Sequence, residues 1–149
     1  MIMGTYTQII YQIVFGTKNR EFTLSKAGRP RLFEYITAIL SNNECHVYIV
    51  NGVDNHLHIV THLHPAISLA CLVKDIKLAS SAMIREKNLF PDFAGWQNGY
   101  GAFTYTINEK RRLIDYVINQ EEHHKVISFK DEYIELLKEN GIDYDERYI

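Results

Sequence analysis

Short hydrophobic stretches rich in β-branched and aromatic residues, one of them alternating with smaller or polar positions, predict the strands of this chain. The segment 6–17 is rich in Ile, Val, Tyr and Phe and carries no helix signal, so it predicts a first strand. Two more β-rich runs, 45–50 and 56–63, are joined by residues 51–55, whose Gly, Asp and Asn favour a hairpin turn. Residues 100–107 alternate large apolar with smaller or polar side chains, which predicts a fourth strand.

Other stretches repeat their apolar residues at intervals of three and four positions, which predicts helices. The first helix is expected over 31–40, and a second over 69–87 with Ser68 as its N-cap. A final pair is expected over 109–125 and 130–140.

The order of these elements is strand, helix, strand, strand, helix, strand, and then two helices. This order predicts an α+β fold: a ferredoxin-like, RRM-like antiparallel sheet with helices on one face and a C-terminal helical extension. At 149 residues, the chain is expected to form one domain over 1–149. Because this fold hosts many activities, function must be argued from individual side chains.

Composition and charge narrow the classes of function. With 46% hydrophobic and 23% charged residues, the chain has the composition of a folded globular protein. Its net charge of −2 argues against a polycation that coats nucleic acid without specificity. Residues 1–112 carry 12 basic and 8 acidic side chains, whereas 113–149 carry 4 and 10, so most of the chain could still present a basic face to a polyanion.

The cysteines and the apolar runs indicate where the protein resides. Cys45 and Cys71 are far apart and lie in apolar sequence, so they are expected to be core thiols in a reducing compartment. The N-terminal stretch has no positive charge before its apolar residues, unlike a signal peptide. The apolar runs are shorter than the roughly 20 residues that a membrane helix needs. We therefore expect a soluble, cytoplasmic protein without membrane partners.

Two histidines stand two positions apart in the third predicted strand. Alternate strand residues share a face, so His56 and His58 point the same way while Leu57 points to the opposite face. A lone histidine is more often a hydrogen-bonded sheet residue, but a pair at this spacing could hold one metal ion. His62 and His64 continue the same parity, so a metal site using any two of the four stays open.

A second pair of polar residues lies on the helix expected over 109–125. Tyr116 and Gln120 are four residues apart, which turns a helix by about 400° and leaves the side chains roughly 40° apart on one face. Alone, this pair carries little information. Tyrosines on amphipathic helices mostly pack in or beside the core, and glutamines are mostly solvated.

Together, the two pairs indicate phosphoryl-transfer chemistry. A metal ion can polarise a phosphodiester while a tyrosine hydroxyl attacks its phosphorus. The pKa of an unperturbed tyrosine is about 10, so at neutral pH its attack needs a nearby cation or base. Two imidazoles and the amide oxygen of Gln120 leave open positions for phosphate and water, which suits a divalent ion such as Mg or Mn, with zinc not excluded.

Three stretches of the sequence carry a family likeness that spans nearly the whole chain. They are DNHLHI at 54–59, WQNGYGAF at 96–103 and YVINQEEHH at 116–124, and residues 6–8 and 129–137 add to them. With these stretches the chain resembles the single-tyrosine HUH transposases of insertion sequences that move as single-stranded DNA, and their REP-associated relatives. Residues 54–59 are similar to the His-hydrophobic-His strand of that family.

The resemblance implies a set of residue roles. Tyr116 would be the nucleophile, His56 and His58 would bind the divalent metal ion, and Gln120 would be a third ligand. The other two strand histidines receive no role. In that family the tyrosine cuts one DNA strand, keeps the 5′ phosphate as a phosphotyrosine and frees a 3′ hydroxyl that can rejoin strands. Bond energy is conserved, so no nucleotide cofactor is required.

The resemblance also implies partners. Family members act on imperfect DNA hairpins near the ends of the element. They work as dimers whose active sites can combine the histidines of one chain with the tyrosine of the other. A homodimer has an independent argument, because excising a segment takes two cuts and this chain offers one tyrosine in the motif context. Whether the site is completed within one chain stays open.

Basic and aromatic residues supply candidate DNA contacts. At the start of the tyrosine helix, Lys110, Arg111 and Arg112 place positive charge where it opposes the helix dipole, which favours phosphate binding over a purely solvated face. The helix over 69–87 adds Lys74, Lys77, Arg85 and Lys87. Three aromatic residues could either stack on DNA bases or pack in the core: Trp96, Tyr100 and Phe103.

Two other classes of function fit the same residues. One is a ferredoxin-like module, or a host-retained copy, that holds single-stranded nucleic acid without cutting it, for which Tyr116→Phe is harmless. Another is a metal-dependent hydrolase or metal-storing protein built on the four strand histidines, with Gln120 incidental. That protein would bind metal without forming covalent DNA.

Overall fold

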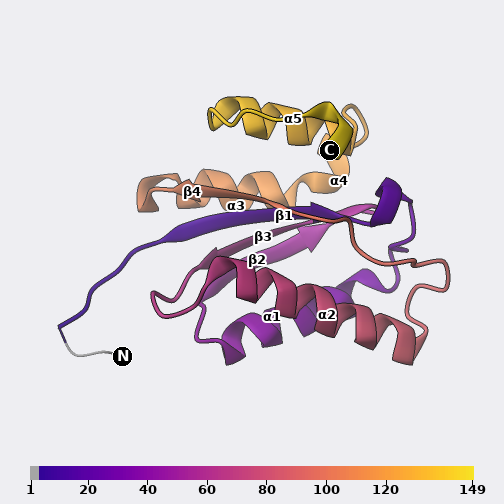
Figure 1. Ribbon diagram of the computed structural model, residues 1–149, viewed down its shortest axis with the longest axis horizontal. Helices are drawn as coiled ribbons and strands as arrows, with labels where there is room; N and C mark the ends of the chain where they lie inside the picture. Colours follow the sequence, from indigo (N-terminus) through magenta and orange to yellow (C-terminus); the bar gives the residue numbers. More distant parts are fainter. Residues whose placement is uncertain (1–3) are drawn as a thin grey trace.

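Four antiparallel strands form the single sheet of this computed structural model, which describes residues 4–149 (Figure 1). The strands are β1 (Ile10–Gly16), β2 (Val47–Gly52), β3 (His56–His62) and β4 (Gly101–Tyr105). Their order across the sheet is β2-β3-β1-β4, so β3 and β1 are the two interior strands. The predicted ferredoxin-like antiparallel sheet is confirmed.

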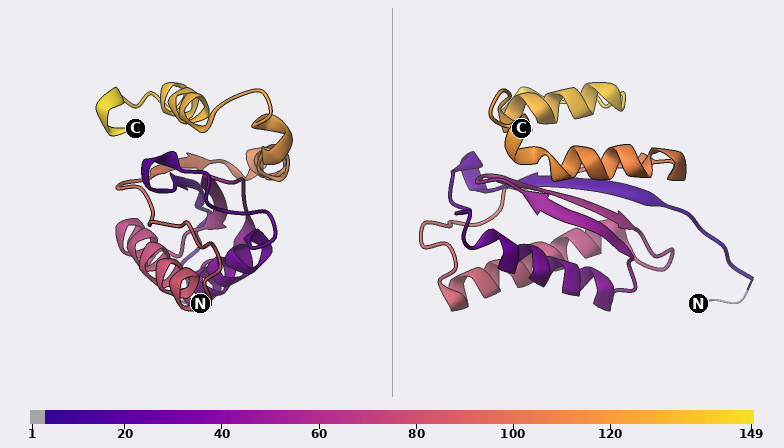
Figure 2. Two further views of the ribbon diagram at one scale, coloured as in Figure 1. Left: turned by 90° about the vertical axis from the view of Figure 1, so that its right-hand side faces the viewer. Right: turned by 180° about the vertical axis from the view of Figure 1, so that it is seen from behind.

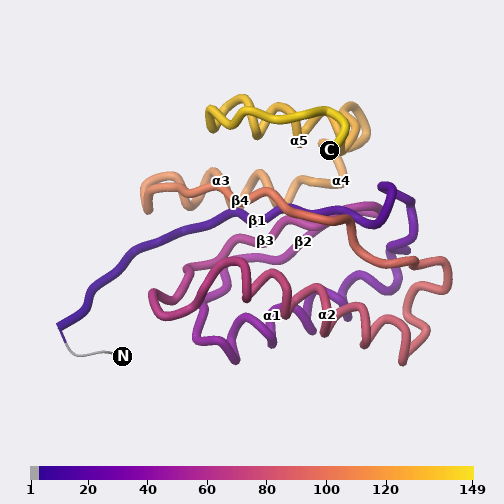
Figure 3. Tube along the Cα trace, in the orientation of Figure 1, coloured from indigo at the N-terminus to yellow at the C-terminus, as the bar shows by residue number. Residues whose placement is uncertain are grey.

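Helices cover both faces of this sheet. One face carries α1 (Arg29–Asn42) and α2 (Leu69–Lys87), and the other carries α3 (Lys110–Ile118), α4 (Gln120–His123) and α5 (Phe129–Glu139) (Figure 2). The C-terminal helical extension is therefore a second layer over the sheet. The chain passes between the layers through the loop that follows α2 and through β4, which leads into α3 (Figure 3).

Local sequence signals account for the starts of three helices. Pro30 lies in the first turn of α1, where its missing N–H costs no hydrogen bond. The predicted N-cap of α2 is confirmed, since the Ser68 hydroxyl accepts a hydrogen bond from the backbone N–H of Cys71 at 3.4 Å. Ser128 caps α5 in the same way, accepting from the N–H of Asp131 at 3.1 Å.

The helix expected over 109–125 is interrupted, so this prediction was wrong in its continuity. Asn119, with φ −89° and ψ 19°, ends α3, and α4 begins at Gln120. The side-chain amide of Asn119 donates to the carbonyl of Asp115 at 3.0 Å. Asparagine competes for backbone partners in this way and favours helix ends. No proline or glycine marks the break, so apolar periodicity alone does not show it.

Alternation along the interior strands separates two environments. Ile13, Phe15, Leu57 and Ile59 are fully buried in the apolar core beneath α1 and α2. The residues between them point to the face covered by α3, α4 and α5.

The two cysteines differ in their exposure. Cys45 is buried, as expected, whereas the prediction that Cys71 is a core thiol was wrong. Cys71 is exposed because it lies on the outward side of α2.

Within residues 4–149, no helix combines the length and the apolar character needed to cross a membrane.

Candidate active site

The two strand histidines lie at the centre of the face covered by α3, α4 and α5. His56 and His58 have no exposed surface, and their ring centroids are 5.1 Å apart. Leu57, between them, belongs to the opposite core. The ring of His56 stacks on Phe129 of α5, with centroids 4.0 Å apart and planes 6° apart. Both imidazoles therefore share one face of the sheet, as the sequence predicts, and the structure places that face under the C-terminal layer.

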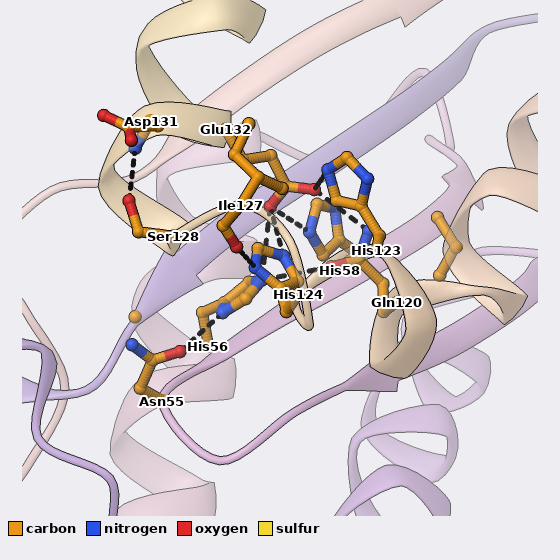
Figure 4. Close-up of polar contacts among 12 residues, drawn as sticks. Asn55, His56, His58, Gln120, His123, His124, Ile127, Ser128, Asp131 and Glu132 are labelled. Carbon is orange, nitrogen blue, oxygen red and sulfur yellow. Dashed lines mark hydrogen bonds and ion pairs between the residues drawn. The ribbon is translucent and has the colours of Figure 1, made fainter.

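A carboxylate from α5 lies among the histidines (Figure 4). Glu132 is 1% exposed, and its Oε1 is 3.0 Å from Nε2 of His58, 3.2 Å from Nε2 of His56 and 3.0 Å from Nε2 of His124. His124 follows α4 directly. The side chains thus come from β3, from the end of α4 and from the first turn of α5, and they meet at one oxygen atom.

The other oxygen of the same carboxylate receives the tyrosine and the glutamine. The hydroxyl of Tyr116 donates a hydrogen bond to Oε2 of Glu132, and Nε2 of Gln120 donates to the same atom at 3.0 Å. The amide oxygen of Gln120 lies 3.1 Å from Nε2 of His56. Although the helix is broken between Tyr116 and Gln120, both side chains reach one partner. The structure therefore brings together all four residues singled out from the sequence.

Burial and hydrogen bonding set the charges in this cluster. Burial lowers the pKa of His56 to about 4, which favours the neutral imidazole that metal ions bind. Burial by itself would raise the pKa of Glu132, but the hydrogen bond from His124 holds it below its usual range. Burial and the neighbouring Glu132 raise the pKa of Tyr116, so its hydroxyl keeps its proton in the resting protein.

The donor set of the cluster fits a divalent metal ion. One ligand atom from each of His56, His58, His124 and Glu132 lies within 4.8 Å of the others. Imidazole nitrogens combined with carboxylate or amide oxygens suit Zn²⁺ and Mn²⁺, and Mg²⁺ prefers the oxygens. The cluster could therefore hold a divalent ion.

The remaining strand histidines take other partners. His62 accepts a hydrogen bond on Nδ1 from the backbone N–H of Ile9 at 3.1 Å. Nε2 of His64 pairs with Oε2 of Glu44 at 3.2 Å. Of the four strand histidines, only His56 and His58 belong to the cluster, which narrows the choice that the sequence leaves open.

The candidate base-stacking aromatics divide in a similar way. Trp96 and Phe103 are buried, and Nε1 of Trp96 donates to the hydroxyl of Ser80 at 3.0 Å. Both are core residues. Tyr100 is half-buried and packs against the core beneath α1 and α2.

Among the candidate DNA-binding cations, Lys77 has a structural role and Arg112 lies beside the site. The ammonium group of Lys77 donates to the carbonyls of Gln97 and Gly99, at 2.9 and 2.5 Å. Arg112 is exposed, pairs with Glu109 at 2.9 Å and lines a cavity of about 240 Å³ whose wall also includes Tyr116. The basic start of α3 therefore borders the tyrosine.

His124 and Glu132 were not predicted as site residues. Glu132 has a sequence signal, because it lies on the apolar stripe of α5, three residues after Phe129 and directly before Tyr133. A carboxylate at a core position needs partners, and here the histidines supply them. His124 has no such signal, since its position depends on the break at Asn119 and on the turn that follows α4.

Comparisons with known proteins agree with this architecture. The model of the family described as "Transposase IS200 like" matches residues 5–120. A crystal structure of a candidate transposase from Deinococcus radiodurans R1 is similar, with a TM-score of 0.60 and 21% identity, over 80% of this chain and 98% of that one. A REP-associated tyrosine transposase bound to a REP hairpin also gives a TM-score of 0.60, at 17% identity, over 87% of this chain and 79% of that one. No curated protein matches the chain.

Proposed function

Because the chain belongs to the IS200-like transposase family, we propose that it cleaves and rejoins single-stranded DNA through Tyr116 in a metal-dependent reaction. One observation carries this proposal. The hydroxyl of Tyr116 and the Nε2 atoms of His56 and His58 all contact the two oxygens of Glu132. A nucleophile and a group of metal-binding side chains therefore share one buried site.

The proposed reaction exchanges one phosphodiester for another. The phenolic oxygen of Tyr116 attacks a backbone phosphorus, which forms a bond from phosphorus to the tyrosine oxygen and breaks the bond from phosphorus to the 3′ oxygen. The phenolic proton passes to Oε2 of Glu132, which accepts its hydrogen bond, and the departing 3′ oxygen takes up a proton to become a hydroxyl. The reverse attack by another 3′ hydroxyl rejoins strands and releases the tyrosine, so no nucleotide is consumed.

The metal ion would be held by His56, His58 and Gln120, with His124 and Glu132 as further donors within reach. When bound, a divalent ion at this position polarises the phosphate and stabilises the charge that develops on it. Glu132 holds the hydroxyl of Tyr116 over the histidine pair. The metal ion and Glu132 would together hold the phosphate and the oxygen of Tyr116 in fixed positions relative to each other.

The proposed substrate is a DNA hairpin with a single-stranded flank, and the proposed working form is a homodimer. The similar REP-associated transposase is bound to a REP hairpin, which supports a hairpin ligand for this fold. Arg112, with Lys110 and Arg111 beside it, lies close to Tyr116 and is suited to contact phosphates near the cut. Two copies of the chain would supply the two nucleophiles that excision of a segment requires.

The test is a covalent adduct assay. The full chain is incubated with Mn²⁺ or Mg²⁺ and single-stranded DNA from the flanks of its own locus, and a denaturation-resistant protein–DNA adduct is measured. We expect an adduct with the native chain, none with Tyr116→Phe, and none after chelation of the metal. Tyr35→Phe on α1, which covers the opposite face of the sheet, is the matched control and should form the adduct normally.

Each alternative function has its own outcome in this assay. Hairpin binding without an adduct in any variant would contradict cleavage and would favour a non-cleaving nucleic-acid module. Metal binding without DNA binding would favour the metal-dependent hydrolase or storage protein. An adduct that persists in Tyr116→Phe would show that another residue is the nucleophile.

A further inference from the structure

Behind each strand histidine of the site stands a buried side-chain amide. The oxygen Oδ1 of Asn55 lies 2.8 Å from Nδ1 of His56, and Oε1 of Gln12 lies 2.7 Å from Nδ1 of His58. Asn55 is 6% exposed and Gln12 is fully buried. Each imidazole is therefore held from the side opposite to Glu132, by a group that has no part in the proposed reaction.

Each amide nitrogen has a partner of its own. Nε2 of Gln12 donates to the hydroxyl of Tyr105 at 2.8 Å, and Nδ2 of Asn55 donates to the carbonyl of Arg20 at 3.5 Å. The amide oxygens face the histidines. An amide oxygen only accepts hydrogen bonds, so the Nδ1 atom that faces it must carry the hydrogen.

We propose that Asn55 and Gln12 are positioning residues that hold His56 and His58 as their Nδ1–H tautomers, which leaves the Nε2 lone pairs free for a metal ion. This inference deepens the proposed function, because the metal ion is part of that function. Partners of this kind orient metal-binding histidines and raise their basicity in many metal sites.

The other two strand histidines are held in the opposite tautomer. Nδ1 of His62 accepts from the N–H of Ile9, and Nδ1 of His64 accepts from the N–H of Ala66, each at 3.1 Å. A backbone N–H is always the donor, so in the neutral form of both rings the hydrogen lies on Nε2. The histidines at 62 and 64, of which His64 lies beyond the end of β3, thus differ from those at 56 and 58 in which ring nitrogen is free.

The proposed tautomer also accounts for the composition of the cluster. With its hydrogen on Nδ1, His56 presents a bare Nε2 to the amide oxygen of Gln120 at 3.1 Å and to Oε1 of Glu132 at 3.2 Å. Three acceptors then face one another with no hydrogen between them. A cation bound among them turns this unfavourable contact into a favourable one.

The first test reads the tautomers directly. Long-range ¹H–¹⁵N NMR spectra of the metal-free full chain, labelled at histidine and recorded above the titration of free imidazole, separate Nδ1–H from Nε2–H rings. We expect Nδ1–H for His56 and His58, with Nε2–H for His62 and His64 as internal references. Nε2–H rings at His56 and His58 would overturn the proposal, whatever the fate of DNA cleavage.

The second test changes one amide at a time and measures Mn²⁺ affinity by calorimetry. Asn55→Leu should weaken binding about 10- to 100-fold and release the tautomer of His56 alone, and Gln12→Met should do the same for His58. Asn55→Asp and Gln12→Glu keep an accepting oxygen and should restore affinity. If the apolar variants bind Mn²⁺ as tightly as the native chain while remaining folded by circular dichroism, the positioning role is wrong.

The two tests also separate this inference from the proposed function. The expected tautomers and tight Mn²⁺ binding without a DNA adduct would support the positioning role of Asn55 and Gln12 and contradict the cleavage reaction. An adduct with Nε2–H rings at His56 and His58 would support the reaction and contradict the positioning role.

Discussion

Neighbouring residues on β1 and β3 enter two different environments. On one face of the sheet, Phe15 and Leu57 join a continuous apolar core beneath α1 and α2. On the other face, Gln12 and His58 are equally buried but are hydrogen-bonded to each other, and His58 also contacts Glu132. Both faces exclude water, yet one does so with apolar packing and the other with paired polar groups.

The site face has little apolar core of its own. Two small clusters border the polar residues. One consists of Val14, Phe103, Phe129, Tyr133, Leu136 and Leu137, and the other of Ile10, Val60, Leu113 and Val117. Because buried polar groups contribute less net stability than apolar packing, we expect the face under α1 and α2 to supply most of the stability. The other face is then free to hold reactive groups.

The largest expected effect is on the apolar face. Phe15 has no exposed surface and packs edge-on against Trp96 with ring centroids 5.1 Å apart. Phe15→Ala should therefore lower the free energy of unfolding by about 3–5 kcal/mol, measured by urea denaturation. Phe22→Ala, at a side chain that is 76% exposed, should change it by less than about 0.5 kcal/mol. Equal losses of unfolding free energy in both variants would contradict the expectation that the apolar face supplies most of the stability.

Metal binding should stabilise the protein only through the face of the sheet that α3, α4 and α5 cover. At a Mn²⁺ concentration of about 100 times Kd, the free energy of unfolding should rise by about 2.7 kcal/mol, or roughly 5–10 °C in Tm. His58→Ala should abolish this increase, measured by thermal melts with Mn²⁺ and with chelator. His62→Ala should keep it, because His62 lies outside the cluster. The proposed site is wrong if His58→Ala retains the full increase.

A polar bond within the apolar face should affect stability alone. The hydroxyl of Ser80 is the acceptor for Nε1 of the buried Trp96, so Ser80→Ala leaves that donor without its partner. We expect a loss of about 1–3 kcal/mol in the free energy of unfolding, followed by the fluorescence of Trp96, the one tryptophan of the chain. Mn²⁺ affinity should stay within twofold of the native value, and a larger change would show that the two faces are coupled.

The smallest expected effect compares two serine caps, one on each face. Ser68→Ala at α2 and Ser128→Ala at α5 should each cost about 1 kcal/mol in the free energy of unfolding. Only Ser128→Ala should also weaken Mn²⁺ binding, by a few-fold. Its backbone carbonyl accepts from the N–H of Glu132 at 3.0 Å, so the cap and the carboxylate share one helical turn. Similar metal affinities in both variants would argue against a role for the first turn of α5.

The sequence predicts this fold well because its strands are rich in β-branched and aromatic residues and β3 begins with alternating histidine and apolar residues. Apolar Leu57 and Ile59 must face the core, and the histidines between them must then face the other layer. The same reasoning places His56 and His58 side by side without any knowledge of their partners. It does not distinguish them from His62 and His64, because the sequence does not show that the strand ends at His62 or which backbone groups lie beside these two rings.

The C-terminal layer is less predictable for a physical reason. Apolar periodicity describes one helix at a time, whereas the position of Glu132 depends on how α5 crosses the sheet after the turn at 124–128. The break at Asn119 follows from competition between a side-chain amide and the helix, and many asparagines within helices do not win that competition. The roles assigned to Tyr116 and Gln120 stay predictions until the adduct is measured.

The interior position of β3 also determines which genetic changes the protein can tolerate. This strand pairs along its length with β1 on one side and β2 on the other, so its register is constrained from both sides. A single in-frame codon inserted between Leu57 and His58 would keep every residue of the site in the chain. It would nevertheless place His56 and His58 on opposite faces of the sheet, because the strand on one side of the insertion must shift by one position. Insertions and deletions here should therefore be purged more strongly than most substitutions.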